Sequence, residues 1–285
     1  MAEPLAAVVV TGAASGIGAA CAARLAAQGY TVLGVDLHGV DIHADLGTST
    51  GRRDAIAAVR TRASALVGLV TCAGLAGSPE RAGSLVASVN YFGTVELLGG
   101  LRPLLVAGTG DGGPGQGRAS AVAISSNSTT VQPAIPLDVV EACLAGDEER
   151  ARSLADEAGS MVTYPASKLA LAWWVRRHAT GPDWAGSGVR LNAVAPGMIE
   201  TPMVQQMRAD PHTGPMLDML PIPIGRPGRP EEIAAVVSLL LGPEGGYFCG
   251  SVLFCDGGSD AVLRTRDWPA AWDISVRDLG RTLTS

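Results

Sequence analysis

The sequence is poor in charged and aromatic residues and contains no long apolar run. Charged residues make up 17% of the 285 positions and aromatic residues 4%, and the formal net charge is -6. Because no basic tract is present, we expect no nucleic-acid partner. No apolar run approaches the roughly 18 to 20 residues that span a bilayer, so we expect no membrane association. The amino terminus has no basic segment before an apolar one, so we expect no signal peptide and a cytoplasmic location.

Cysteine is also scarce. The chain has five cysteines, which are scattered and form no Cys-x-x-Cys pair: Cys21, Cys72, Cys143, Cys249 and Cys255. We therefore expect no metal site and no disulfide framework, and interpret the cysteines as free thiols in a reducing compartment. Hydrophobic residues are abundant at 47% of the chain, which is enough for a large buried core. The length suits one large α/β domain or two small ones.

Glycines follow the first apolar run at a spacing that is typical of dinucleotide binding. Residues 5–11 are continuously apolar, as in a strand buried on both faces of a parallel sheet, and an alanine-rich helical run then extends to residue 28. Between them, Gly12 allows a turn, Gly16 allows the backbone to approach a pyrophosphate, and Gly18 allows close packing of helix on strand. The amino terminus of the helix then faces the phosphates. We predict a dinucleotide site here, with a purely structural turn as the alternative.

An acidic residue ends the second predicted strand, residues 31–35. Asp36 lies 18 residues after Gly18, close to where a carboxylate binds the adenosine ribose in dinucleotide sites. It would accept hydrogen bonds from both ribose hydroxyls and repel a 2′-phosphate. Leu37 and the residues directly after it provide no Arg or Lys, so we predict NAD rather than NADP. The alternative is an ordinary aspartate at a strand-end turn.

The connection after the second strand is too short to hold a helix. A short strand is expected at 40–44, although a parallel crossover usually takes a dozen or more residues. Asp45 and Leu46 close that strand and are placed to flank the adenine. A buried strand is predicted for 65–72, and Ala73 and Gly74 follow it, where small side chains let a cofactor lie close.

Further along the chain, polar residues occur where apolar segments end or are interrupted. Residues 119–124 predict a strand that delivers Ser125 and Ser126 at its carboxyl end, the edge where open α/β sheets bind ligands. Asn90 lies inside a helix predicted for about 84–107. An asparagine there makes no capping contribution, so its side chain needs another partner or water. The glycine-rich stretch 108–118 predicts an exposed loop.

Tyr164 and Lys168 are four residues apart, so they share one face if the stretch 161–175 is a helix. Pro165 is expected in the first turn, where its missing N–H is harmless. An ammonium beside a phenol favours the phenolate and lowers the pKa of the tyrosine, which makes a general acid/base for neutral pH. The alternative is a solvated helix face with one aromatic residue on the core.

Two other segments have open interpretations. Residues 133–160 have the pattern of an insertion with helices at 137–145 and 147–158, and either a lid or an interface element would account for them. Five of the seven methionines lie between residues 198 and 219. Methionine adapts to irregular apolar shapes, so this segment would suit a bulky hydrophobic substrate, with short helices packed on the body as the alternative.

Together these motifs resemble the short-chain dehydrogenase/reductase family from about residue 6 to residue 262. Within that family the chain is similar to the bacterial 3α-hydroxysteroid dehydrogenase/carbonyl reductase group. The missing helix after Asp36 and the long insertion before Tyr164 are part of this likeness. The matching motifs occur in the family's order and are Thr11-Gly-x-x-x-Gly-Ile-Gly18, Ala73-Gly74, Asn90, Ser126, Tyr164-x-x-x-Lys168, Pro196-Gly197 with Thr201, and Asp256-Gly257-Gly258.

The resemblance implies a single-domain α/β Rossmann fold over residues 1–262, with a C-terminal tail at 263–285. The fold would be a doubly wound, seven-stranded parallel sheet, with residues 133–160 as a helical insertion before the active-site helix. The implied activity is NAD(H)-dependent interconversion of a hydrophobic secondary alcohol and its ketone, with a steroid 3-hydroxyl as the first candidate. Another alicyclic or terpenoid alcohol is the alternative substrate, and a non-catalytic NAD-binding regulator is the alternative of another class. A homodimer is implied, with a tetramer as the alternative, because the insertion blocks one usual dimer contact.

The resemblance also implies roles for single residues. Tyr164 would be the acid/base, and Lys168 would lower its pKa and hold the nicotinamide ribose. Ser126 would bond the substrate oxygen. Asn90 would position a water that relays protons, and Ile199 would contact the carboxamide through its backbone. The implied cofactor-binding residues are Gly12, Ser15, Gly16, Ile17, Gly18, Asp36, Leu37, Asp45, Leu46, Cys72, Ala73, Gly74, Tyr164, Lys168, Pro196, Gly197, Ile199 and Thr201. Thr71 and Cys72 stand where the family usually has two asparagines, which leaves the cofactor packing there open.

Overall fold

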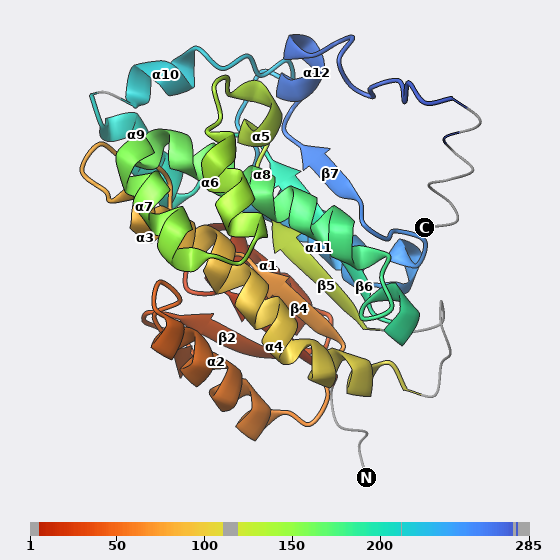
Figure 1. Ribbon diagram of the computed structural model, residues 1–285. Coiled ribbons are helices and arrows are strands. Elements are labelled where there is room, and N and C mark those ends of the chain that lie inside the picture. The colour runs from red at the N-terminus through yellow and green to blue at the C-terminus, as the bar shows by residue number, and fades with distance from the viewer. Residues whose placement is uncertain (1–5, 111–118, 212, 276–277, 279–285) are drawn as a thin grey trace.

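The computed structural model describes residues 6–110, 119–211, 213–275 and 278, and a parallel seven-stranded sheet lies at its centre (Figure 1). The strands follow the order β3-β2-β1-β4-β5-β6-β7 across the sheet. Their bounds are β1 (Ala7–Thr11), β2 (Thr31–Asp36), β3 (Ile42–His43), β4 (Gly68–Thr71), β5 (Ser120–Ile124), β6 (Arg190–Pro196) and β7 (Val252–Cys255). The chain winds outward from β1 to β3 and then crosses back to β4, which pairs with the other edge of β1. The prediction of a doubly wound, seven-stranded parallel sheet is thus confirmed. The predictions for residues 5, 111–118, 276–277 and 279–285 lie outside the described residues.

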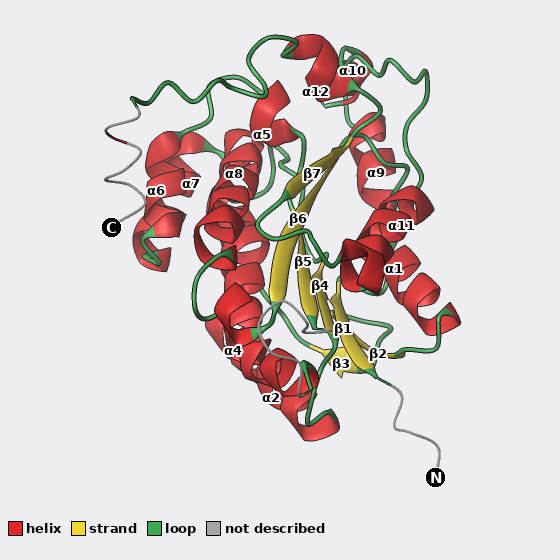
Figure 2. Ribbon diagram, turned by 90° about the vertical axis from the view of Figure 1, so that its right-hand side faces the viewer, coloured by secondary structure: helices red, strands yellow, loops and turns green. Residues whose placement is uncertain are grey.

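Helices cover both faces of this sheet (Figure 2). On one face α1 packs against α11, and on the other lie α2, α4 and α8. The main helices are α1 (Gly16–Ala27), α2 (Ser49–Arg62), α3 (Gly83–Ala87), α4 (Gly93–Gly108), α5 (Ser128–Val131), α6 (Leu137–Leu144), α7 (Glu148–Ala158), α8 (Ser160–Ala179), α9 (Pro202–Ala209), α10 (Gly214–Asp218), α11 (Pro230–Leu241) and α12 (Ser259–Leu263). No helix within the described ranges is both long and apolar enough to cross a membrane.

The first strand shows why its sequence is continuously apolar. Successive side chains of a strand point to opposite faces, so Val8 and Val10 enter the core on the α1 side, whereas Val9 enters the core on the α2 side. All three are at most 1% exposed. Both faces of the sheet are therefore buried, as parallel sheets require.

The short connection after β2 holds no helix, as predicted. Residues 37–41 form bends, and β3 then pairs in parallel with β2 through Val35 and Asp36. The N–H of Ala44 donates to the carbonyl of Asp36 at 2.9 Å. No helix therefore covers the end of β2 between Asp36 and β3.

The helix predicted for residues 84–107 is not one regular helix. The chain is helical from Gly83 to Gly108, which confirms the predicted helix, but a π-helical segment, Ser88–Phe92, lies between α3 and α4. The side chains of this segment make hydrogen bonds to distant parts of the chain: Ser88 bonds Glu148, and Asn90 bonds Leu75. Such tertiary bonds accompany a π-turn, and short π-segments are frequent at functional sites.

Pro165 does not lie in the first helical turn. Helix α8 begins at Ser160, so the proline is in its second turn, and the prediction of its position was wrong. At the start of this helix the N–H of Thr163 donates to the carbonyl of Gly159 at 3.1 Å, and its hydroxyl donates to the same carbonyl at 2.9 Å. Ser160 donates to the carbonyl of Ser78 at 2.5 Å and accepts from its N–H at 2.9 Å. These bonds fix the start of α8 ahead of Pro165, which removes one backbone hydrogen bond from within the helix.

The predicted insertion packs against the body of the protein through its backbone. Helices α6 and α7 contact α8, and α7 also contacts α3. A side chain at Gly83 of α3 would overlap the carbonyl group of Ala155 in α7, so the two helices approach as closely as their backbones allow. The N–H of Ser84 donates to the Asp156 carboxylate at 2.8 Å. The insertion is therefore packed tightly against α3.

A fully buried guanidinium also joins the insertion to the first half of the sheet. The side chain of Arg52 in α2 has no exposed surface, and its Nε donates to Glu96 of α4 at 2.9 Å. Its terminal nitrogens donate to the two carboxylate oxygens of Glu148 in α7 at 3.1 and 2.5 Å. Nη1 also donates to the carbonyl of Leu46 at 3.3 Å. Because a buried charge is costly unless it is paired, this network holds α2, α4 and α7 together.

We expect Glu148→Gln to lower the free energy of unfolding by about 2 kcal/mol, because it removes one of the two carboxylates that neutralise the buried Arg52. Denaturant unfolding measures this change. The matched control is Glu149→Gln, since Glu149 is exposed in the same first turn of α7 and experiences a similar helix dipole. The control should change stability by less than about 0.5 kcal/mol. Equal losses in the two variants would contradict the network's role.

Candidate active site

The turn between β1 and α1 and the first turn of α1 each require a glycine. Gly12 has a φ of +66°, and a Cβ atom there would lie 2.8 Å from the backbone nitrogen of Ala73. A Cβ atom at Gly18 would overlap the carbonyl group of Gly12. These contacts bring the turn, the first residues of α1 and the end of β4 together at one edge of the sheet.

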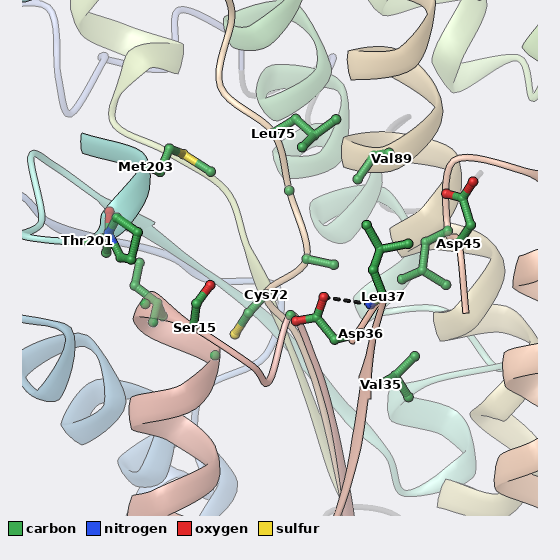
Figure 3. A pocket seen from close by; sticks show the side chains of 18 of the residues that line it. Ser15, Val35, Asp36, Leu37, Asp45, Cys72, Leu75, Val89, Thr201 and Met203 are labelled. Carbon is green, nitrogen blue, oxygen red and sulfur yellow. Dashed lines mark hydrogen bonds between the residues drawn. The ribbon is translucent and has the colours of Figure 1, made fainter. Parts of the chain in front are cut away.

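A cleft of about 500 Å³ lies at this edge (Figure 3). In the figure Thr201 and Met203 lie on one side, Ser15 and Cys72 in the middle, and Leu37, Val89 and Asp45 on the other side. The residues predicted for the cofactor that line the cleft are Gly12, Ser15, Gly16, Ile17, Gly18, Asp36, Leu37, Asp45, Leu46, Cys72, Ala73, Gly74 and Thr201. The structure thus brings together segments that are far apart in the sequence.

The Asp36 carboxylate is held in place at the end of β2. Its Oδ2 accepts from the N–H of Ala14 at 3.0 Å and its Oδ1 accepts from the N–H of Leu37 at 2.7 Å. A carboxylate has about four lone-pair positions, so both oxygens keep acceptor capacity for hydroxyl groups. The side chain of Leu37 beside it is 54% exposed and offers no polar group.

Sequence reasoning missed several residues of the cleft wall. Leu85 and Val89 lie on the helical segments after β4, and their spacing of four residues is a signal that could have found them. Leu75 follows the predicted Gly74 directly. Arg81 also lines the cleft, from the loop between β4 and α3, and its sequence context carries no pattern that marks it.

The two serines at the end of β5 have different partners. The Ser125 hydroxyl donates to the carbonyl of Lys168 at 2.9 Å, so it points into the packing between β5 and α8. The Ser126 hydroxyl accepts from the N–H of Ser128 at 3.1 Å, and its interaction with the phenol of Tyr164 lowers the pKa of that phenol. Of the two hydroxyl groups, that of Ser126 is therefore the one paired with the phenol.

Lys168 is buried one turn beyond Tyr164 in α8. Its side chain is 4% exposed, and its ammonium donates to the carbonyl of Ile124 at 2.8 Å. Burial lowers the pKa of Lys168 to about 8. Burial raises the pKa of the partly buried Tyr164, whereas its hydrogen bond with Ser126 lowers it. The lowered tyrosine pKa predicted from the spacing alone was wrong for the chain as it stands, because desolvation has the larger effect.

Asn90 and Lys168 both lie close to Gly74 at the cleft. A Cβ atom at Gly74 would lie 3.2 Å from Asn90 Oδ1 and 3.4 Å from Lys168 Nζ. Asn90 is fully buried and accepts from the N–H of Leu75 at 2.7 Å, and it donates to the carbonyl of Leu75 at 3.0 Å. It also donates to the hydroxyl of Ser167 at 3.2 Å. The hydrogen-bond partner of this helical asparagine is thus the loop after β4. Its role in positioning a water stays a prediction.

The segment that follows β6, from Gly197 to Thr201, borders the site next to the ends of β5 and β7. The N–H of Asn127 donates to the carbonyl of Pro196 at 2.9 Å, which joins this segment to the end of β5. A Cβ atom at Gly197 would lie 2.7 Å from Asp256, so the chain passes close to the end of β7. Ile199 is buried at 4% exposure, and Thr201 caps α9 by accepting from the N–H of Val204 at 3.3 Å. The predicted contact between the Ile199 backbone and a carboxamide stays a prediction.

Thr71 and Cys72 fill the positions at the end of β4 with uncharged groups. A hydrogen bond with Cys21, together with burial, raises the pKa of the Cys72 thiol well above its ordinary value, so this cysteine stays protonated. The Thr71 hydroxyl is buried without a hydrogen-bond partner. Among the described residues, no group of three or more His, Cys, Asp or Glu side chains is placed to hold a metal ion.

The arrangement suits proton transfer beside the cleft. A phenol that is hydrogen-bonded to a hydroxyl can give a proton to an oxygen atom or remove one from an alcohol. The ammonium one helical turn further on lies next to Gly74, which lines the cleft. The groups that would handle a proton therefore adjoin the wall of the cleft.

Comparisons with known proteins agree with this geometry. The family described as enoyl-(acyl carrier protein) reductase matches residues 157–260. The 3-alpha-hydroxysteroid dehydrogenase/carbonyl reductase of Comamonas testosteroni is 38% identical over 90% of this chain and 97% of its own. The cis-4-hydroxycyclohexanecarboxylate dehydrogenase of Sinomonas cyclohexanicum is 32% identical over 89% of this chain and 96% of its own.

A solved structure is similar over almost the same range. It is the 3-alpha-hydroxysteroid dehydrogenase from Pseudomonas sp. B-0831 in complex with NADH, which is 43% identical and superposes with a TM-score of 0.86. The likeness covers 92% of this chain and 100% of that one. The glycine turn, the serine, tyrosine and lysine beside the cleft and these relatives lead to one conclusion: the chain belongs to the short-chain dehydrogenase/reductase family of oxidoreductases.

Proposed function

We propose that the protein interconverts a hydrophobic secondary alcohol and its ketone with NAD(H). The observation that carries this proposal is the Ser126 hydroxyl that acts on the phenol of Tyr164, with the Lys168 ammonium beside Gly74 in the wall of the cleft. A protein that only binds a dinucleotide needs none of these acid/base groups. The non-catalytic regulator is therefore the weaker alternative.

The cleft fits a dinucleotide. Gly16 has a φ of +54°, and a Cβ atom there would lie 3.2 Å from Thr201, so any side chain would fill the space above the turn. The turn from Ser15 to Gly18 would hold the pyrophosphate, and Asp36 would bind the adenosine ribose. Asp45 and Leu46 would flank the adenine. When bound, the nicotinamide accepts or donates the hydride.

The same cleft supports NAD over NADP. The Asp36 carboxylate would face the ribose hydroxyls, and it would repel a 2′-phosphate. Leu37 supplies no charge to offset that repulsion. The similar hydroxysteroid dehydrogenase structure contains NADH, which supports the same preference.

In the proposed reaction this chain's own residues handle the proton and the orientation of the substrate. The Ser126 hydroxyl would bond the substrate oxygen, and the Tyr164 phenol would give that oxygen a proton during reduction or remove it during oxidation. Tyr164 and Lys168 would also hold the nicotinamide ribose. A cationic Lys168 beside that ribose would favour the phenolate and so oppose the effect of burial on the pKa of Tyr164.

The proposed substrate is a steroid with a 3-hydroxyl or 3-keto group. The names of two relatives support it, and the methionine-rich segment 198–222 supplies the adaptable apolar surface that such a substrate needs. A smaller alicyclic alcohol is the second candidate, because one relative is named for a hydroxycyclohexanecarboxylate. A homodimer in the cytoplasm is part of the proposal and rests on the family likeness.

Substrate oxidation tests the proposal directly. With NAD, a panel of 3α- and 3β-hydroxysteroids, alicyclic alcohols and terpenols should give selective NADH formation with the 3α-hydroxysteroids, and NADP should be used poorly. Selective turnover of an alicyclic alcohol would keep the mechanism and change the substrate. A clear preference for NADP would contradict the role of Asp36. Binding of NADH without turnover of any alcohol would favour the regulator.

Tyr164→Phe should lower kcat/KM for the best substrate at least about 100-fold, because the variant keeps the ring and loses the proton donor. NADH binding, followed by fluorescence, should change only a few-fold. Tyr247→Phe is the matched control, since Tyr247 is fully exposed and its substitution should leave kcat/KM unchanged. Unchanged turnover in Tyr164→Phe would show that another group carries the proton.

Lys168 should also make stability depend on pH. Because burial lowers the pKa of its ammonium from 10.5 to about 8, the folded protein binds fewer protons than the unfolded chain between these pH values. The cost of burying the charge is therefore present below about pH 8 and is relieved as the pH rises through this window. Measured relative to Lys168→Met, the wild-type free energy of unfolding should rise by about 2 kcal/mol between pH 7 and pH 9.5. Parallel pH curves for the two proteins would contradict the burial of a charged lysine.

A further inference from the structure

Arg81 lies where two cavities meet. It belongs to the loop between β4 and α3 and is half-buried. It lines the cleft described above and also a neighbouring cavity of about 320 Å³. Ser15 of the glycine turn borders the same two cavities, as do Pro202 and Met203 at the start of α9. The junction of the cavities is thus bordered by the glycine turn, by α9 and by the side chain of Arg81.

One cation and three carboxylates line the two cavities, and the cation lies where the cavities meet. Arg81 is the only cationic side chain among the described residues that line either cavity. The carboxylates of the lining belong to Asp36 and Asp45 in the cleft and to Asp210 in the neighbouring cavity. A pyrophosphate would add two negative charges next to the glycine turn. The amino terminus of α1 offers only a partial positive charge, so the full charge of Arg81 is the complement on the other side.

The loop holds Arg81 in place while leaving donors available. The N–H of Arg81 donates to the carbonyl of Ser78 at 2.9 Å, and Ser78 is itself bonded to Ser160 of α8. Nη1 of Arg81 donates to the carbonyl of Ala76. A guanidinium has five N–H donors in a rigid fork, so this single bond leaves others for two oxygens of one anion. That geometry matches phosphate groups better than a lone hydroxyl.

We propose that Arg81 binds the pyrophosphate of the dinucleotide from the loop after β4, facing the glycine turn across the junction of the two cavities. This inference rests on the proposed function, since it takes the cleft to be the dinucleotide site. It assigns the phosphate charge to a side chain outside the glycine turn.

Arg81→Gln tests this assignment through binding rather than turnover. ADP-ribose carries the pyrophosphate and adenosine lacks it, so the two can be compared by calorimetry and by ligand-observed NMR. ADP-ribose should bind the variant about tenfold more weakly, as expected for the loss of a hydrogen bond to a charged group, and adenosine should bind equally well. Added salt should weaken ADP-ribose binding less in the variant than in the wild type.

Two further variants control the experiment. Arg81→Lys keeps the charge and loses the fork, so its affinity for ADP-ribose should lie between those of the wild type and Arg81→Gln. Arg102→Gln removes the same charge from α4, where Arg102 pairs with Asp183 and lines neither cavity. It should leave both affinities unchanged.

Tight binding of ADP-ribose by the wild type with an unchanged affinity in Arg81→Gln would overturn this proposal alone. An equal loss of adenosine and ADP-ribose binding would also overturn it, because the arginine would then shape the cleft and not hold the phosphates. If only the KM of an anionic alcohol rises, the arginine serves the substrate and the proposal is wrong. A wild type that binds neither NADH nor ADP-ribose would overturn the proposed function together with it.

Discussion

The buried ammonium of Lys168 fixes the relative positions of α8 and β5, and the candidate site depends on that. Its Nζ donates to the carbonyl of Ile124, while the backbone carbonyl of Lys168 accepts from the hydroxyl of Ser125. Two bonds in opposite directions therefore join one residue of the helix to the end of the strand. Tyr164 lies one turn earlier on that helix, and Ser126 is the second residue after that strand. Their mutual distance is set by the backbone, and small errors in such distances are costly for catalysis.

A second set of polar contacts extends this order to the loop after β4. Asn90 bonds both the N–H and the carbonyl of Leu75 and reaches Ser167, the residue next to Lys168. The loop that follows carries Arg81, and Ser160 at the start of α8 holds its far side through Ser78. The proton-handling groups and the cleft wall are thus parts of one hydrogen-bonded structure. The insertion belongs to it as well, because Glu148 bonds both Ser88 and Arg52.

Features that depend on neighbouring residues could be predicted from the sequence, and those that depend on distant contacts could not. The glycine turn and Asp36 follow strands that are visible as apolar runs, so their place at the sheet edge was predictable. From the sequence alone, Arg52 is expected to be an ordinary exposed residue of a helix. Its burial is explained by its contact with Glu148, which is 96 positions away. The position of Pro165 and the raised pKa of Tyr164 were missed for the same reason, since upstream side chains extend α8 and the surrounding protein desolvates the phenol. The place of Arg81 in the cleft wall could not be predicted from the sequence, because it depends on α9 and the glycine turn, which border the same cavity.

The π-helical segment between α3 and α4 limits how this region can vary in length. A π-turn contains one residue more than an α-turn, which rotates the helix that follows by about 100° relative to the helix before it. The earlier helix presents Gly83 to α7 and Leu85 to the cleft, while the later one presents Leu97 and Leu101 to the core beneath the sheet. A chain that lost one residue here would keep one of these sets of contacts and turn the other away. Deletions and insertions in this stretch are therefore excluded by the geometry of the two neighbouring helices, even at positions that touch no ligand.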